Sequence, residues 1–303
     1  MSNSDVLSIK AEEQSVNAGK KLRSAGGFRW SVGSIIFFVV FALYAATLIG
    51  SLVWVFENSL KTKYEYMESV VRLPAKWLFS NYVRAFEVLR INDQNAISML
   101  INSLWLSIAR PAIGLSTACM ASYVMAKYKF PGRGLIWGIM LTTMVIPIYG
   151  SGSATLILYK NLHFYDSPLF LVTSITGLGG SMMIIAAFES VSKSYMEAAF
   201  VEGAGHFRVF WQIMLPQISG LLSALFIMSF VGGWNDYMTS IMYLPSYLTL
   251  STGLYIFQQI NARTLDIPVL FAGALMCMIP TSVLYIVFQD KFMNLSFGGG
   301  IKG

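Results

Sequence analysis

Side chains that could carry out enzymatic chemistry are scattered in this 303-residue sequence. It holds two histidines, His163 and His206, and two cysteines, Cys119 and Cys277, which both fall inside apolar runs. A catalytic centre needs a clustered nucleophile, an acid–base pair or metal ligands, and a redox cysteine pair needs a CxxC spacing. None of these patterns occurs, so we predict no catalytic residue and no metal site in this chain.

A phosphate-binding loop is also missing from the sequence. The pattern G-x-x-x-x-G-K-[ST] supplies backbone amides and a lysine to a nucleotide, but Gly19 and Lys20 lack both the first glycine and the following Ser or Thr. We therefore expect the chain itself to bind neither ATP nor another cofactor.

Polar and small residues do gather in one short stretch, EAAFVEGAGHFRVFWQIMLP, at residues 197–216. From Lys193 to Ala204 the pattern predicts a short helix, with Ser194 as the N-cap and Gly203 or Gly205 as the terminator. Such a segment is either a docking helix for another protein or an ordinary solvated loop helix.

The docking interpretation depends on the side chains that this short helix would expose. Glu197 is predicted in the first turn, where the helix dipole favours a carboxylate that can pair with a partner's Arg or Lys. Ala198, Ala199 and Gly203 would leave one surface nearly bare of side chain. Another protein could then approach the helix closely.

Composition places the rest of the chain in a membrane. Hydrophobic residues make up 55% and charged residues 12% of the sequence, against roughly 25% charged residues in a soluble domain. A helix of about 20 apolar residues crosses a bilayer, and six stretches qualify: about 30–56, 98–122, 135–158, 168–190, 213–236 and 267–289. We expect an all-α membrane protein with a tail at 1–29, one six-span domain at 30–290 and a tail at 291–303.

The loop charges predict the orientation of these spans. Loop 123–134 holds three basic residues, whereas loops 159–167 and 237–266 hold one each. Because basic residues concentrate in cytoplasmic loops, both termini and the polar loop at 191–212 are predicted on the cytoplasmic side. The long connection at 57–97 is then external.

Four residues are candidates for lining a transport pathway: Arg110, Pro147, Trp234 and Asn235. A charge in mid-membrane costs about 2.5–3.5 kcal/mol on insertion scales, so Arg110 should have a partner. No Asp or Glu is predicted deep in a span, which leaves backbone carbonyls, a companion subunit or an acidic substrate group. Pro147 would weaken a helix beside a cavity, and Trp234 and Asn235 could either meet a sugar or anchor the fifth span at the membrane interface.

The polar stretch resembles the EAA loop of the membrane subunits of ABC importers. The positions that carry the resemblance are Glu197, Ala198, Ala199, Gly203, Ile213, Leu215 and Pro216. Flanking motifs resemble the carbohydrate-uptake branch, typified by the shorter permease of the maltose importer: Asn102-Ser103-Leu104, Phe130-Pro131-Gly132, Trp234-Asn235-Asp236 and the ending Gly299-Gly300-Ile301-Lys302-Gly303. The sequence departs from the family at Val191-Ser192-Lys193-Ser194, where an Ile-Pro is usual, so the start of the helix is less sharply fixed.

The resemblance implies a type I importer permease of a bacterial inner membrane. The EAA residues would form a coupling helix that docks in an ATPase subunit, and residues 299–303 would also contact the ATPase. The implied partners are a second permease subunit, two ATP-binding subunits that hold ATP and Mg, and an extracellular or periplasmic solute-binding protein. The implied substrates are oligosaccharides or related carbohydrates, with acidic sugars an open alternative.

Two other classes of transporter remain as alternatives. An ion-driven secondary transporter should show carboxylates or broken helices at mid-membrane in two matching halves, and the carboxylates are missing. An ABC permease for a non-sugar solute would share the EAA loop but not the carbohydrate-type flanking motifs.

Overall fold

The computed structural model describes residues 32–91, 93–146, 150, 152–176, 181–260 and 266–298. The chain divides into two compact units, residues 1–55 and 56–303. The first unit holds most of helix α2 (Val32–Ser59), which is 28 residues long and carries its first charge at Glu57. This helix matches the first predicted span and, at about 1.5 Å per residue, is longer than a bilayer core is thick.

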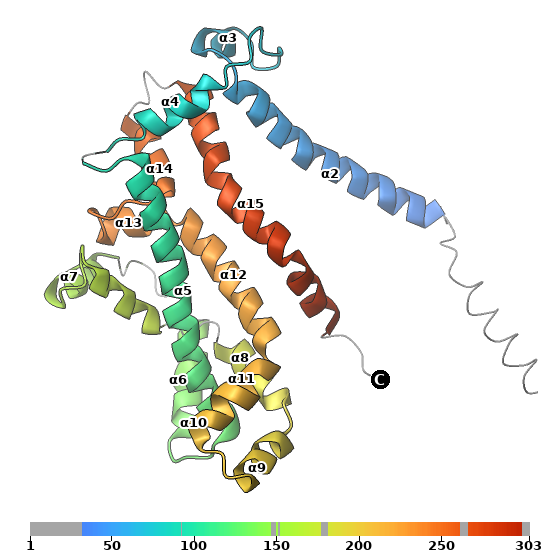
Figure 1. The fold of residues 1–303 in the computed structure, drawn as a ribbon, viewed down its shortest axis with the longest axis vertical. Helices are drawn as coiled ribbons and strands as arrows, with labels where there is room; N and C mark the ends of the chain where they lie inside the picture. The colour runs from blue at the N-terminus through green and yellow to red at the C-terminus, as the bar shows by residue number, and fades with distance from the viewer. Residues whose placement is uncertain are drawn as a thin grey trace, which may run out of the picture. The chain divides into compact units, whose positions relative to one another are not determined.

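The regular elements among the described residues of the second unit are helices joined by loops, apart from one isolated bridge between Ile91 and Gln94 (Figure 1). Its first half contains α3 (Lys63–Glu68), α4 (Ser80–Val88), α5 (Ala96–Lys127), α6 (Arg133–Val145), α7 (Gly152–Asn161), the 3-10 helix η1 (Pro168–Thr176) and α8 (Ser181–Ser190). Its second half contains α9 (Lys193–Val201), α10 (His206–Arg208), the π-helix η2 (Val209–Met214), α11 (Leu215–Gln217), α12 (Ser219–Asn235), α13 (Met238–Tyr243), α14 (Leu250–Ile260) and α15 (Ile267–Gly298).

Side-chain caps fix where several of these helices start. Asn95 and Ser98 form a capping box at the start of α5, in which each side chain accepts a hydrogen bond from the other residue's backbone N–H. Thr62 and Glu65 form the same motif at α3. The backbone N–H of Thr62 is the main cause that lowers the pKa of the Glu65 carboxyl, because it stabilises the ionised form.

The described helices match the six predicted spans to different degrees. Three helices are long and apolar enough to cross a membrane, namely α2, α5 and residues 267–289 of α15, and a fourth span results if residues 206–217 and α12 are counted together across a 77° bend. The third predicted span corresponds to α6 and α7, which begin two residues before it and end three residues after it, and the fourth corresponds to η1 and α8. Between the two helices of each pair lie residues that the structure does not describe. Pro280 lies inside the continuous α15, so it does not break that helix.

Helix α5 runs through the second unit and packs closely against α8 and α12 (Figure 1). Small residues permit this approach, since a Cβ atom placed on Gly233 of α12 would lie 3.6 Å from the Cα atom of Ser107 on α5. The ends of α5 lie near α4 and near α9, on opposite sides of the unit. A buried apolar cluster holds the α9 end together, with members from α5, α8, α9 and η2.

Candidate functional site

The polar stretch forms the helix α9, and its first residues differ from the prediction. Ser192 is the N-cap, with its side chain accepting a hydrogen bond from the backbone N–H of Ser194, so the prediction of Ser194 as the cap is wrong. Ser192 has the extended backbone that a cap requires (φ −60°, ψ 137°). Since the helix starts at Lys193, Glu197 lies in its second turn and not in the first, and the predicted contribution of the helix dipole is correspondingly weaker.

The end of α9 confirms Gly203 as the terminator. The N–H of Gly203 donates to the carbonyl of Phe200 at 3.0 Å, and the N–H of Ala204 donates to the carbonyl of Ala199 at 3.0 Å. This bond pattern is a Schellman motif, which places the residue after the cap in the left-handed region. Gly203 has φ +82°, a conformation that costs glycine little and other residues more.

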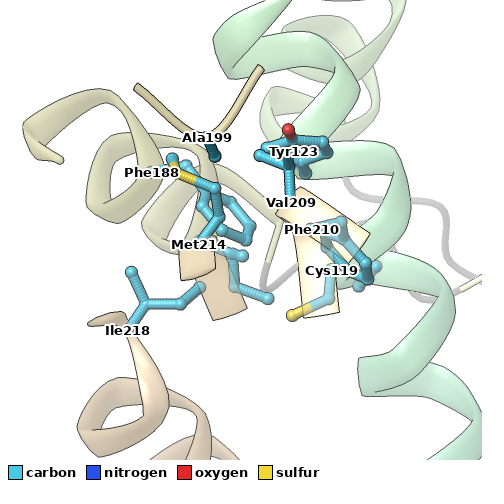
Figure 2. Close-up of a cluster of buried hydrophobic side chains, with 10 residues drawn as sticks. Cys119, Tyr123, Phe188, Ala199, Val209, Phe210, Met214 and Ile218 are labelled. Atoms are coloured by element: carbon cyan, nitrogen blue, oxygen red, sulfur yellow. The ribbon is translucent and has the colours of Figure 1, made fainter. Parts of the chain in front are cut away.

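Two neighbouring alanines of the predicted coupling surface differ in burial on α9. Glu197, Ala198 and Gly203 are exposed, whereas Ala199 is buried and belongs to the apolar cluster between α5, α8 and η2 (Figure 2). Met196 and Phe200 pack against the same cluster, at the helical spacing that puts them on the face of Ala199. The prediction that Ala199 belongs to the bare outer surface is therefore wrong.

The remaining EAA positions lie at the transition into the fifth predicted span. Ile213 and Leu215 are half-buried and pack against the apolar cluster, while Pro216 is exposed near the start of the short α11. The 77° bend follows this helix, so these residues sit where the chain turns into α12.

Sequence reasoning missed two residues that hold the loop around α9 in place. Lys127 donates from Nζ to the carbonyl oxygen of Val191 at 2.6 Å, and the Tyr128 hydroxyl forms a 2.7 Å hydrogen bond with Nδ1 of His206. Lys127 is one of the three basic residues of the predicted loop 123–134, but it lies in the last turn of α5. A lysine and a tyrosine side by side at the end of a long apolar helix were the available signal, but their partners are 64 and 78 positions away.

Among the pathway candidates, Arg110 has a partner that the sequence did not suggest. Its guanidinium lies 3.4 Å from Oδ2 of Asp236 and 5.4 Å from the ring centroid of Phe170. The expectation that only carbonyls, a companion subunit or a substrate could balance this charge is wrong. Asp236 was not considered as a partner of Arg110, because it lies at the very end of the fifth predicted span and not deep within it.

The other pathway candidates differ in how accessible they are. Trp234 is 1% exposed and its Nε1 donates to the carbonyl of Cys277 at 2.9 Å, so in this conformation it faces neither a substrate nor the membrane interface, and that prediction is corrected. Asn235 is exposed, and its amide donates to the carbonyl of Val231 at 2.9 Å. Pro147 and residues 299–303 lie outside the described residues.

A cavity of about 840 Å³ lies between α5, η2, α11, α12 and α15. Its lining is mostly apolar, with side chains such as Leu104, Phe226 and Val283, and includes neither Arg110 nor Asn235. Only a few side chains there, such as Ser116 and Ser223, could hydrogen-bond the hydroxyls of a sugar, which is unfavourable for a polar ligand. In the part of the chain that the structure describes, no three His, Cys, Asp or Glu side chains come together as a metal site would require.

Apolar helices long enough for a bilayer, with a short helix carried on a loop at one end, define a multi-pass membrane protein. The family described as "Binding-protein-dependent transport system inner membrane component" matches residues 113–292, and the chain belongs to this family. The resemblance inferred from the EAA positions is thereby confirmed at the level of the family.

Relatives agree with this assignment over most of the chain. The diacetylchitobiose uptake system permease of Streptomyces coelicolor is 27% identical over 82% of this chain and 82% of its own length. The arabinooligosaccharides transport system permease of Halalkalibacterium halodurans is 30% identical over 67% of this chain and 73% of its own length. A crystal structure of a bacterial ABC transporter for the acidic polysaccharide alginate superposes with a TM-score of 0.74 and 19% identity, covering 86% of this chain and 98% of that one, which shows the same fold.

Proposed function

We propose that this chain is a permease subunit of an ATP-driven, binding-protein-dependent importer of oligosaccharides or related carbohydrates. The observation that carries the proposal is the geometry of α9. One face of this helix is fixed to the protein's own core through Ala199, and the other exposes Glu197 and Ala198. A helix held in this way can receive force from a docked protein and pass it on.

The substrate class rests on the relatives. The permeases reported above serve diacetylchitobiose and arabinooligosaccharides by their names, and both cover two thirds or more of the chain. The alginate importer contributes the fold but not the substrate, because its identity is too low.

An acidic substrate is a narrower version of the same proposal. The ion pair with Asp236 partly neutralises Arg110, so a substrate carboxylate would have to compete with Asp236 for the guanidinium. Under this version, Arg110→Met slows uptake of acidic oligosaccharides more than that of neutral ones. Equal uptake of acidic sugars by Arg110→Met and the wild type at equal expression would contradict it.

The partners follow from the same proposal. A second permease subunit would complete the pathway, two ATP-binding subunits would hold ATP and Mg and receive α9, and a solute-binding protein would deliver the sugar. Basic residues of loop 123–134 favour a cytoplasmic position for α9 and both termini. Residues 299–303 would form a second contact with the ATPase.

The proposed mechanism is alternating access driven from α9. ATP binding would bring the ATPase subunits together and move the two docked helices, turning the pathway outward, and hydrolysis would reset it. Glu197 would form a charged contact with the ATPase, and Ala198 and Gly203 would permit close approach. Leu215 and Pro216 would hold the turn into α12.

The test is ATP hydrolysis by the reconstituted complex. The chain is purified with its companion permease and ATPase, placed in liposomes, and mixed with candidate binding proteins loaded with neutral or acidic oligosaccharides. We expect one loaded binding protein to stimulate ATP hydrolysis, and we expect Glu197→Lys to reduce this stimulation. The control is the same charge reversal at Glu87 on α4, Glu87→Lys, which lies away from α9 and should not reduce it in this way. A chain that transports sugar alone, down an ion gradient and without an ATPase, would refute the proposal.

A further inference from the structure

We propose that the end of α5 carries the movement of the α9 loop, defined as residues 191–208, into the second predicted span. Two neighbouring residues, Lys127 and Tyr128, form the attachment. This inference rests on the proposed function, because it concerns how movement of a docked helix reaches the transport pathway. It assigns a positioning role to the two residues.

Lys127 is attached to the first residue of the α9 loop. Its Nζ donates to the carbonyl oxygen of Val191 at 2.6 Å, and the residue is only 7% exposed. Val191 follows the end of α8 and precedes the N-cap of α9 by one position. A charged donor on a carbonyl at a helix C-terminus makes a stronger bond than a neutral one, so this contact resists separation of α5 from the start of α9.

Tyr128 is attached to the other side of the same loop. Its hydroxyl bonds to Nδ1 of His206 at 2.7 Å, and His206 is the first residue of α10. The imidazole ring of His206 lies 4.8 Å from the ring of Phe200, which belongs to α9 itself. The bond therefore connects α5 to the end of α9.

A third contact from α5 meets α9 between these two. The Tyr123 hydroxyl donates to Sδ of Met196 at 3.5 Å. The ring of Tyr123 lies 5.4 Å from that of Phe188 and 5.0 Å from that of Phe210, within the cluster shown in Figure 2. The last turns of α5 thus contact the loop before, within and after α9. A displacement of α9 cannot leave all three contacts intact unless α5 moves as well.

The alternative route, along the chain from α9 to α12, is less direct. It passes through α10, the π-helix η2, α11 and the 77° bend. A π-helix and a bend are places where a helix can change shape and absorb movement. By contrast, α5 continues as one helix of 32 residues to Lys127, and its internal proline, Pro111, lies well away from that end.

The backbone of α9 packs mainly against η2, so the attachment to α5 depends on side chains. This makes it separable by mutation. Lys127→Met keeps the aliphatic stem and removes the donor, and Tyr128→Phe keeps the ring and removes the hydroxyl. Lys127→Arg retains a donor, and Lys129→Met removes an exposed neighbouring charge as the matched control.

The experiment measures ATP hydrolysed per sugar imported by the full complex in liposomes. We expect Lys127→Met and Tyr128→Phe each to raise this ratio about fivefold, the lower end of the range for coupling between sites. For Lys127→Arg and Lys129→Met, the ratio of ATP hydrolysed to sugar imported should stay within about twofold of the wild-type ratio, which is below the usual range for coupling between sites. Thermal unfolding and copurification of the ATPase show that each variant is folded and assembled.

Each outcome decides a different question. If the wild-type complex shows no stimulated hydrolysis with any loaded binding protein, the proposed function fails. If the wild type is coupled and both variants keep its ratio, the attachment through α5 is overturned while the function stands. If the variants lose hydrolysis and import in equal proportion, or shed the ATPase, the two residues only build the docking surface and the positioning role is likewise overturned.

Discussion

Arg110 and Asp236 join the middle of α5 to the end of α12 through an ion pair of 3.4 Å between Nη1 and Oδ2. The same carboxylate accepts hydrogen bonds from the backbone N–H and the hydroxyl of Thr239, and so also holds the start of α13. One acidic side chain thereby links three helices. The charge of Arg110, which is expensive in a membrane, is balanced within the chain.

Breaking this pair should destabilise the protein, and removing both charges should restore part of the loss. We expect Arg110→Met to lower the free energy of unfolding by about 1 kcal/mol. This is less than a hydrogen bond to a charged group usually contributes, because the side chains of Arg110 and Asp236 remain 31% and 29% exposed to solvent. Arg110→Met leaves Asp236 without its counter-charge, whereas the double variant with Asp236→Asn leaves no lone charge. Thermal unfolding in detergent measures both, and strictly additive losses would show that the pair contributes nothing.

The left-handed conformation of Gly203 predicts a specific requirement for glycine. Gly203→Ala should cost about 1–2 kcal/mol in local stability, because a Cβ atom disfavours φ +82°. Gly203→Asn should cost less, since asparagine tolerates this region. The matched control is Gly205→Ala, where φ is −73° and a Cβ atom would meet no other atom within 4 Å.

The measurement is amide hydrogen exchange across α9. Faster exchange in Gly203→Ala, with Gly205→Ala unchanged, would support the Schellman motif as the device that ends the helix. Equal exchange in both alanine variants would show that the glycine at 203 is not required for conformation.

The different burial of Ala198 and Ala199 predicts different consequences for the same substitution. Ala199→Glu places a charge in the apolar cluster and should lower the unfolding temperature strongly, because a buried unpaired carboxylate is costly. Ala198→Glu leaves the fold intact, since this residue is exposed. It should instead weaken ATPase copurification under the proposed function. The reverse pattern in thermal unfolding would contradict the orientation of α9.

How much of this arrangement the sequence could predict depends on how local each feature is. The long apolar helices and the terminator Gly203 follow from runs and spacings within a few residues, and they were predicted. The burial of Ala199 was also within reach, because Met196 and Phe200 share its face at helical spacing. Ser192 and Ser194 were both possible N-caps of α9 in the sequence, and only the backbone conformation shows that Ser192 is the cap.

Contacts between distant residues were beyond a single sequence. The pairs Arg110–Asp236 and Lys127–Val191 are 126 and 64 positions apart, and nothing in the spacing of either pair indicates that they meet. Arg110 was correctly expected to need a partner, whereas no partner was expected for Lys127. Which partners they find is decided by how α5 packs against α8 and α12.

The packing of α14 against α5 gives a last prediction, at Gly253. A Cβ atom at this position would lie 2.5 Å from Sδ of Met99, which is fully buried, and 3.5 Å from Leu89. Gly253→Ala should therefore cost roughly 1–3 kcal/mol, the usual range for overpacking a filled core. Gly232→Ala is the control, because a Cβ atom in that part of α12 meets nothing within 4 Å.

Thermal unfolding of the two variants distinguishes overpacking from a general effect of adding a methyl group to a helix. Alanine at 232 should be neutral or slightly stabilising, since it favours helix more than glycine does. Met99→Ala introduced with Gly253→Ala makes room for the methyl group, so the combined loss should be smaller than the sum of the two single losses. If the losses add fully, Met99 and Gly253 do not share the contact that brings α14 against α5.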